Sequence, residues 1–97
     1  MVTSARQSGC RLILDFWTSW CGPCKSLDEW IWTDADVAAV LNAGYVGVKL
    51  DGDLQKDLVS RFRVEGYPTI IVLDSSGKEI RRFGYVPSQQ ILAVLGH

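Results

Sequence analysis

The sequence predicts an α/β fold, in which one mixed four-stranded sheet carries helices on both faces. Short apolar segments, typical of buried strands, alternate along the chain with segments of helical period. Strands separated by helices favour parallel pairing, whereas two strands joined by a short turn favour antiparallel pairing. The turn at 74–77, which ends in glycine, lies between the last two apolar segments and predicts a C-terminal antiparallel hairpin.

The first strand is expected at 11–17, where an apolar run ends at a Thr-Ser pair. Asp15 interrupts this run, and a carboxylate in a buried strand needs a specific reason because burying a charge is costly. A helix is expected over 21–32, since apolar residues recur there at helical spacing. Pro23 suits the first turn of this helix, where its missing N–H costs nothing.

A second helix is expected to begin at Thr33, because Thr-Asp-Ala-Asp has the Thr-x-x-acid form of a capping box. Asn-Ala-Gly at 42–44 closes that helix. A strand is expected at 45–50, where apolar residues occupy alternate positions. Another helix is then expected over 54–62, marked by apolar residues from Leu54 onward.

The C-terminal part of the chain is expected to hold two strands and a helix. The strands lie at 69–73 and 78–83, and the helix begins at Pro87 and buries Ile91, Leu92 and Leu95. No repeat or linker interrupts the chain, so residues 1–97 are expected to form one domain.

Composition excludes several functional classes. The chain has 97 residues, of which 47% are hydrophobic and 22% charged, unlike disordered or low-complexity proteins. Ten basic and eleven acidic residues give a net charge of −1, which implies no basic face for nucleic acid. No apolar run approaches the roughly 20 residues of a membrane span.

Three cysteines are too few for a disulfide scaffold. A structural zinc site usually needs four Cys or His ligands. The candidates are Cys10, Cys21, Cys24 and the terminal His97, so no metal site is expected. Cys10 is expected to be a small apolar residue at the start of the first strand, with a regulatory or intermolecular disulfide as the alternative.

The Cys-Gly-Pro-Cys motif lies where the first expected strand passes into the first helix. Cys21 therefore faces free backbone N–H groups and the positive end of the helix dipole, which favour its thiolate, and Lys25 adds positive charge. Cys24 follows about one turn later, within disulfide reach. This predicts Cys21 as the attacking nucleophile and Cys24 as the resolving thiol. The alternatives are buried structural thiols or half of a metal site.

Residues 15–25, Asp-Phe-Trp-Thr-Ser-Trp-Cys-Gly-Pro-Cys-Lys, resemble the active-site segment of the thioredoxin family. Gly-Tyr-Pro-Thr at 66–69 resembles the cis-proline loop of that family, and Gly84 matches the glycine after its last strand. The resemblance covers nearly the whole chain and implies a thioredoxin fold. Between 24 and 51 the chain is more similar to the C-terminal thioredoxin-like domain of periplasmic transmembrane disulfide reductases, because Thr-Asp-Ala-Asp-Val at 33–37 fits a helix found there.

The resemblance implies a role for two charged residues. Asp15 matches the buried aspartate of the family, which implies that it accepts the proton of Cys24, with a pKa raised by burial. A solvated strand end is the alternative for Asp15. Lys49 matches the lysine that pairs with that aspartate, and an exposed strand lysine is the alternative for it.

The resemblance also implies a surface for substrate. Pro68 is expected to follow a cis peptide bond, with a plain turn proline as the alternative. The exposed backbone of Tyr67 would then pair with a substrate peptide by strand addition. Trp20 is expected to flank the dithiol as an apolar contact. Gly22, Pro23 and Gly84 complete the expected substrate-binding residues.

Three features depart from the family pattern. Glu29 replaces a kinking proline, so the active-site helix is expected to be straighter or to end differently near Trp32. Trp30 and Trp32 cannot share one helix face, so one is expected in the core and the other on a docking surface. Only nine residues precede Cys10, so the additional N-terminal strand of the family is expected to be absent and the strand at 45–50 is expected at a sheet edge.

The leading interpretation is a protein-disulfide oxidoreductase of the reducing kind, which needs no metal or organic cofactor. Its expected partners are disulfide-containing proteins and an upstream dithiol donor, with no nucleic acid, and it is expected to be a monomer or a weak edge-strand dimer. Two alternatives stay open: a redox-sensing docking or chaperone module, and a metal or iron–sulfur site shared across a dimer. The compartment stays open too: the lack of a signal peptide favours the cytoplasm, but an excised periplasmic domain would look the same.

Overall fold

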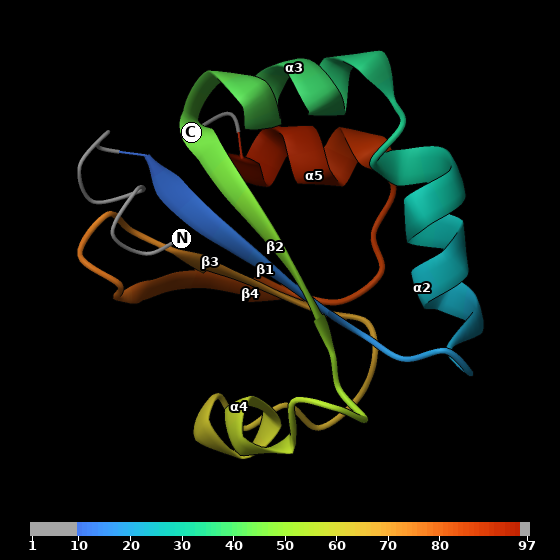
Figure 1. The fold of residues 1–97 in the computed structure, drawn as a ribbon. Coiled ribbons are helices and arrows are strands. Elements are labelled where there is room, and N and C mark those ends of the chain that lie inside the picture. Colours follow the sequence, from blue (N-terminus) through green and yellow to red (C-terminus); the bar gives the residue numbers. More distant parts are fainter. Residues whose placement is uncertain (1–9, 96–97) are drawn as a thin grey trace.

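The computed structural model of the chain describes residues 10–95. The first strand, β1 (Arg11–Trp17), leads into helix α2 (Gly22–Ser26), which continues without a break as the π-helical segment η1 (Leu27–Ile31). Figure 1 shows how the remaining elements are arranged: α3 (Ala35–Gly44), β2 (Tyr45–Asp51), α4 (Lys56–Arg61), β3 (Thr69–Leu73), β4 (Glu79–Phe83) and α5 (Ser88–Leu95).

The four strands form one mixed sheet in the order β2-β1-β3-β4. β1 and β2 are parallel, whereas β3 is antiparallel to both of its neighbours. The predicted mixed sheet and its C-terminal hairpin are confirmed. The expectation that strands separated by a helix are parallel holds for β1 and β2 only. After α4, β3 pairs with β1 on the edge opposite to β2 and runs antiparallel to it.

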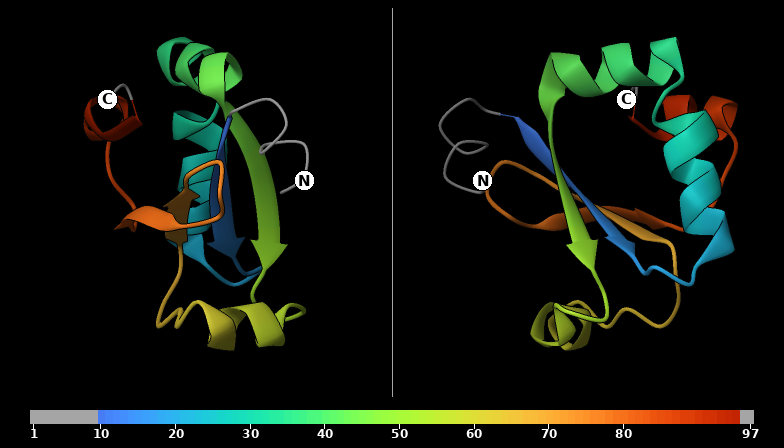
Figure 2. Two further views of the ribbon diagram at one scale, coloured as in Figure 1. Left: turned by 90° about the vertical axis from the view of Figure 1, so that its left-hand side faces the viewer. Right: turned by 45° about the vertical axis from the view of Figure 1, so that its right-hand side comes forward.

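Helices cover both faces of this sheet, as predicted. In Figures 1 and 2, α2, α3 and α5 lie on one side of the sheet and α4 lies on the other. Alternate residues of β1 point to opposite faces. Ile13 packs in the core beneath η1, α3 and α5, whereas Leu12, Leu14 and Phe16 pack in a second cluster on the side of α4. Asp15 shares the parity of Ile13 and therefore points toward the layer of three helices.

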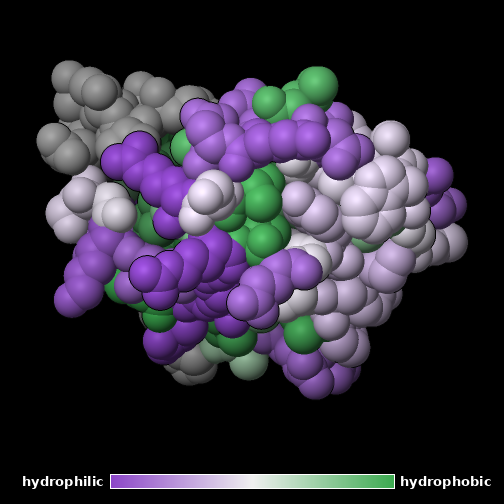
Figure 3. Space-filling model, turned by 90° about the horizontal axis from the view of Figure 1, so that it is seen from below, coloured by the Kyte–Doolittle hydropathy of each residue, from purple (hydrophilic) through white to green (hydrophobic). Residues whose placement is uncertain are grey.

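The face on the side of α4 is only partly covered by that short helix. Figure 3 looks onto it from below and shows apolar surface at its centre, framed by hydrophilic side chains. A cavity of about 250 Å³ lies there, between residues of β1, β2, β3 and α4. The predicted absence of an extra N-terminal strand concerns residues 1–9, which lie outside the described part of the chain. Within residues 10–95, β2 pairs with β1 alone and is a sheet edge, as expected.

The first helix differs from the expected regular helix over 21–32. After Ser26 it widens into a π-helical turn, closed by the bond from the Trp32 N–H to the Leu27 carbonyl at 2.9 Å. Such a turn contains an additional residue and rotates the side chains that follow it. Trp30 is 66% exposed, whereas Trp32 is half-buried and packs against the core. The expected division between one core and one exposed tryptophan is confirmed.

Two helix starts differ from the sequence expectation. The helix expected over 54–62 begins at Lys56, because Leu54 and Gln55 both donate to the carbonyl of Asp51 and belong to the preceding turn. Leu54 is accordingly 79% exposed rather than buried.

No helix in the described part of the chain is both long and apolar enough to cross a membrane.

The N-cap of α3 is Asp34 rather than the expected Thr33. The Oδ1 atom of Asp34 accepts hydrogen bonds from the backbone N–H groups of Asp36 and Val37, at 2.9 and 3.2 Å. The Thr33 hydroxyl instead donates to the carbonyl of Glu29 at 2.7 Å, at the end of the preceding helix. Thr33 therefore terminates one helix while Asp34 starts the next.

This assignment predicts different effects for two neighbouring substitutions. Asp34→Ala should lower the free energy of unfolding by about 1 kcal/mol, because two N–H groups of α3 lose their acceptor. Thr33→Ala, on the surface, should change it by less than about 0.5 kcal/mol. Urea denaturation of both variants measures the difference. A larger loss of unfolding free energy for Thr33→Ala than for Asp34→Ala would instead identify Thr33 as the N-cap, as the sequence pattern predicts.

Candidate functional site

The predicted dithiol forms a disulfide between Cys21 and Cys24 at the junction of β1 and α2. The two Cα atoms are 5.3 Å apart, within the range for a disulfide. Cys21 is the N-cap of α2, and its Sγ accepts a hydrogen bond from the Cys24 N–H at 3.1 Å. Each cysteine residue is 3% exposed, so its place in the helix, and not its exposure, distinguishes the two.

The rim of the dithiol is built from two aromatic rings. Trp20 is 67% exposed, and its indole N–H donates to Oδ2 of Asp53 at 3.1 Å. The Tyr67 ring meets Trp20 edge to face, with ring centroids 5.7 Å apart. Gly52 makes room for this pair, because a Cβ atom there would overlap the Tyr67 ring. Three segments that are distant in sequence thus meet beside Cys21.

The proline loop completes this side of the site. The peptide bond between Tyr67 and Pro68 is cis, as predicted, and Pro68 is buried. Gly84 lies close to the loop, since a Cβ atom on it would be 3.5 Å from the Pro68 carbonyl oxygen. Gly22 and Pro23 are exposed at the start of α2. The structure therefore brings Trp20 to Tyr67 and Pro68 to Gly84.

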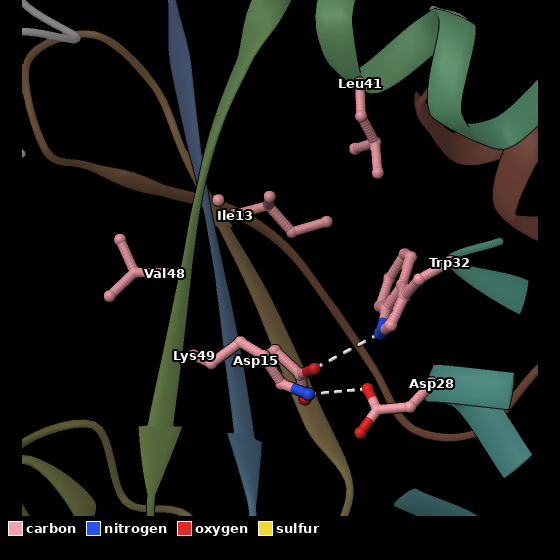
Figure 4. A pocket seen from close by; sticks show the side chains of 8 residues that line it. Ile13, Asp15, Asp28, Trp32, Leu41, Val48 and Lys49 are labelled. Carbon is pink, nitrogen blue, oxygen red and sulfur yellow. Dashed lines mark hydrogen bonds and ion pairs between the residues drawn. The ribbon is translucent and has the colours of Figure 1, made fainter. Parts of the chain in front are cut away.

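Asp15 is buried, with 8% of the residue exposed. Asp15 lines a cavity of about 350 Å³ between β1, β2 and the helical layer, and Figure 4 shows the side chains around it. Its Oδ2 atom accepts a hydrogen bond from the indole N–H of Trp32 at 3.2 Å, whereas Oδ1 has no hydrogen-bond partner among the described residues. Burial raises the pKa of Asp15 above its usual range, as expected. The charge of Lys49 acts against that rise, Asp28 adds to it, and the Trp32 bond acts against it.

Lys49 lies opposite Asp15 in the register of β1 and β2. Its ammonium group, however, forms an ion pair with Oδ1 of Asp28 at 2.6 Å and lies 5.6 Å from the ring centroid of Trp17. The expected close pair of Lys49 and Asp15 is therefore replaced by a pair with Asp28. The charge of Lys49 still acts on Asp15 from a longer distance.

Sequence reasoning did not find four residues of this site: Asp28, Trp32, Gly52 and Asp53. Trp32 was noticed only for its bulk, and its hydrogen bond to Asp15 joins positions 17 residues apart. Trp20 and Asp53 are 33 residues apart. Such contacts leave no periodic signal in the sequence.

Cys10 has a free, half-buried thiol, and His97 lies outside the described residues. Within 10–95, no group of three or more Cys, His, Asp and Glu side chains is placed to hold a metal ion.

Comparison with known proteins agrees with this geometry. A family model described as a thioredoxin-like domain matches residues 1–97. Thioredoxin 1 of Chlorobaculum tepidum is 31% identical over 86 residues, which cover 89% of this chain and 82% of that protein. A thioredoxin of Staphylococcus haemolyticus is 34% identical over 93 residues, covering 92% of this chain and 82% of that protein. The solution structure of a thioredoxin from Thermus thermophilus superposes with a TM-score of 0.87 at 26% identity, covering 98% and 78% of the two chains.

The buried charge predicts how stability changes with pH. The folded pKa of Asp15 is raised above its ordinary value of 3.8, so the folded state prefers the protonated acid. The free energy of unfolding is then greatest below pH 3.8 and falls as pH rises through the folded pKa. The total loss is about 1.4 kcal/mol for each pH unit between the unfolded and the folded pKa. Asp15→Asn removes this loss. We expect the variant to match the wild type near pH 4 and to be more stable near pH 8.

Urea denaturation between pH 4 and pH 8 measures the difference, with Asp57→Asn as the control. Asp57 is an exposed aspartate in the first turn of α4, so its substitution should change the free energy of unfolding by less than about 0.5 kcal/mol. An Asp15→Asn advantage that stays constant with pH would contradict the buried charge as its cause.

Proposed function

We propose that this chain, which belongs to the thioredoxin-like family, reduces disulfide bonds in partner proteins through Cys21 and Cys24. Its family, its thioredoxin relatives and its Cys-Gly-Pro-Cys disulfide make it a thiol–disulfide oxidoreductase. The observation that carries the proposal is the position of the disulfide: Cys21 is the N-cap of α2, and its Sγ accepts a hydrogen bond from the N–H of Cys24.

Cys21 is the attacking thiol in this proposal. In the reduced protein, the N–H of Cys24 and the positive end of the helix stabilise negative charge on Sγ of Cys21, and Lys25 adds positive charge nearby. The Cys21 thiolate attacks a substrate disulfide. A bond forms between Cys21 and one substrate sulfur, the substrate S–S bond breaks, and the other substrate sulfur leaves and takes up a proton.

Cys24 resolves the mixed disulfide. Its sulfur attacks Sγ of Cys21, which forms the internal disulfide and releases the second substrate sulfur. The substrate disulfide is reduced to two thiols while the protein dithiol is oxidised. We propose that Asp15 accepts the proton of Cys24 in this step, because a carboxyl with a raised pKa is a better match to a thiol than an ordinary aspartate. Lys49 influences Asp15 through its charge.

Substrate docking is proposed at the rim of the dithiol. Trp20 offers an exposed apolar ring, and the backbone of Tyr67 before cis Pro68 would pair with an extended substrate segment. Gly22, Pro23 and Gly84 would let that segment approach closely.

Further partners follow from the same chemistry. An upstream dithiol donor would return the internal disulfide to the reduced state.

We propose that residues 1–97 act as one domain, as a monomer or as a weak dimer through the edge of β2.

Two cysteine variants test the assignment of roles. Cys21→Ser should reduce the insulin-reduction rate to background, because the attacking thiol is lost. Cys24→Ser should also stop turnover, yet it should accumulate a mixed disulfide with the substrate that non-reducing electrophoresis detects. Accumulation in Cys21→Ser instead would reverse the roles, and an inactive wild type with a reducible internal disulfide would rule out the reductase.

Substitution of exposed tryptophans tests the docking surface. Trp20→Ala should lower kcat/KM for a protein disulfide by about tenfold, chiefly through KM, because an aromatic contact is lost. It should change the reaction with a small aromatic disulfide much less. Trp30→Ala, which removes a side chain of similar exposure on η1, is the matched control and should leave both reactions unchanged. A loss that occurs only with Trp30→Ala would favour docking through η1.

A further inference from the structure

The carboxyl of Asp15 is held by a residue outside the dithiol and the substrate-binding rim, Trp32. Within the described residues, Trp32 provides the one hydrogen bond to the Asp15 carboxyl, from its indole N–H to Oδ2 at 3.2 Å. Figure 4 shows the indole of Trp32 pointing its nitrogen at Asp15, while Asp28 and Lys49 face each other beside them. The carboxyl is thus held at one oxygen only.

The cation opposite Asp15 does not compete with this bond. Lys49 is drawn to Asp28 by an ion pair of 2.6 Å, and both side chains are about half exposed, at 51% and 45%. The charged groups that act on Asp15 are therefore Lys49 from β2 and Asp28 from η1. On the other side, β3 places the apolar Ile70 opposite Asp15 in the register. Trp32 is the direct hydrogen-bond donor, and the two charges act from further away.

We propose that Trp32 is a positioning residue for the resolving step: its indole N–H occupies Oδ2 of Asp15, so that Oδ1 is the atom that takes up the proton of Cys24. This inference rests on the proposed role of Asp15 as proton acceptor. A carboxylate oxygen that already accepts an N–H bond is the poorer site for a proton, because protonation there would compete with the donor. Oδ1 is buried and lacks a partner, so it is the atom with free acceptor capacity.

The π-helical turn places Trp32 for this contact. The bond from the Trp32 N–H to the Leu27 carbonyl closes the wide turn, and Trp32 follows directly after η1. Its indole thereby faces β1, whereas Trp30, two residues earlier, is 66% exposed. Two tryptophans on one helix thus differ in whether they contact the carboxyl.

The proton balance of the step is complete without another reactant. The proton passes from Sγ of Cys24 to Oδ1 of Asp15 as the Cys24 sulfur attacks Sγ of Cys21. The bond between Cys21 and the substrate sulfur breaks, and the leaving substrate thiolate takes up the proton from Asp15. The carboxylate is restored, the protein dithiol is oxidised to the disulfide, and the substrate sulfur is reduced to a thiol.

Trp32→Phe tests the proposal because it keeps an aromatic ring and removes the N–H. An N–H donated to a carboxylate favours its charged form, so the variant should raise the pKa of Asp15. The single-turnover oxidation of the reduced protein by a peptide disulfide should slow by about tenfold on the acidic side of its pH profile, where less Asp15 is ionised. At high pH the rate should match that of the wild type. Trp30→Phe is the matched control and should leave the profile unchanged.

Two further measurements separate positioning from a general loss of packing. Trp32→Phe added to Asp15→Asn should change the pH profile no further than Asp15→Asn alone. In the wild type, the Trp32 indole N–H resonance should titrate with the midpoint of the Asp15 carboxyl resonance, and Asp15→Asn should abolish this titration. The spectroscopic experiment needs no tryptophan variant, so it decides the case even where Trp32→Phe does not fold.

The outcomes distinguish this inference from the function on which it rests. If Asp15→Asn alters the pH profile while Trp32→Phe does not, or the indole resonance ignores the carboxyl titration, then the role of Trp32 is overturned and that of Asp15 stands. If Asp15→Asn leaves the profile unchanged, then the proposed role of Asp15 fails and the inference fails with it. An equal effect of Trp30→Phe would also overturn the role of Trp32.

Discussion

The pairing of β1 on both sides is the constraint on which the whole site depends. Its register with β2 sets Lys49 opposite Asp15, and its register with β3 sets Phe16 opposite Thr69, directly after the cis-proline loop. The strand ends at Trp17, and a short turn leads from there to Cys21, the N-cap of the active-site helix. A slip of one residue would turn Asp15 to the other face of the sheet. The carboxyl, the dithiol and the proline loop are therefore placed together by one strand.

The proposed role of Asp15 as a base depends on surroundings that keep its pKa above that of an ordinary aspartate. A close ion pair with Lys49 would lower the pKa of Asp15 toward that of an ordinary aspartate, and the carboxylate would then be a weak base for a thiol. Asp28 prevents this by binding the ammonium group, and the single bond from Trp32 offsets only part of the cost of burial. The same acidic residue thus weakens the pull of a cation on Asp15 and adds its own negative charge nearby.

Local patterns predicted the features that depend on local forces. The strands followed from apolar runs, and the position of the dithiol followed from the junction of a strand and a helix. The pattern failed where two local choices compete: Thr33 and Asp34 can each cap a helix, and the preceding helix uses Thr33 to bond Glu29. It also failed for Lys49, which lies opposite Asp15 in the register of β1 and β2 but forms its ion pair with Asp28. A π-helical turn has no signature at a period of 3.6 residues.

Asp15 and Cys24 are two buried groups that exchange one proton in the proposed cycle of the reduced protein. In the oxidised protein the Cys21–Cys24 disulfide has no proton to give, and Asp15 titrates alone. The proton affinity of the carboxyl must therefore differ between the two redox states. By thermodynamic linkage, the reduction potential of the disulfide then depends on pH through Asp15 as well as through the thiols. Any contact that holds one oxygen of Asp15, as Trp32 does, thereby acts on the potential of a disulfide that it does not touch.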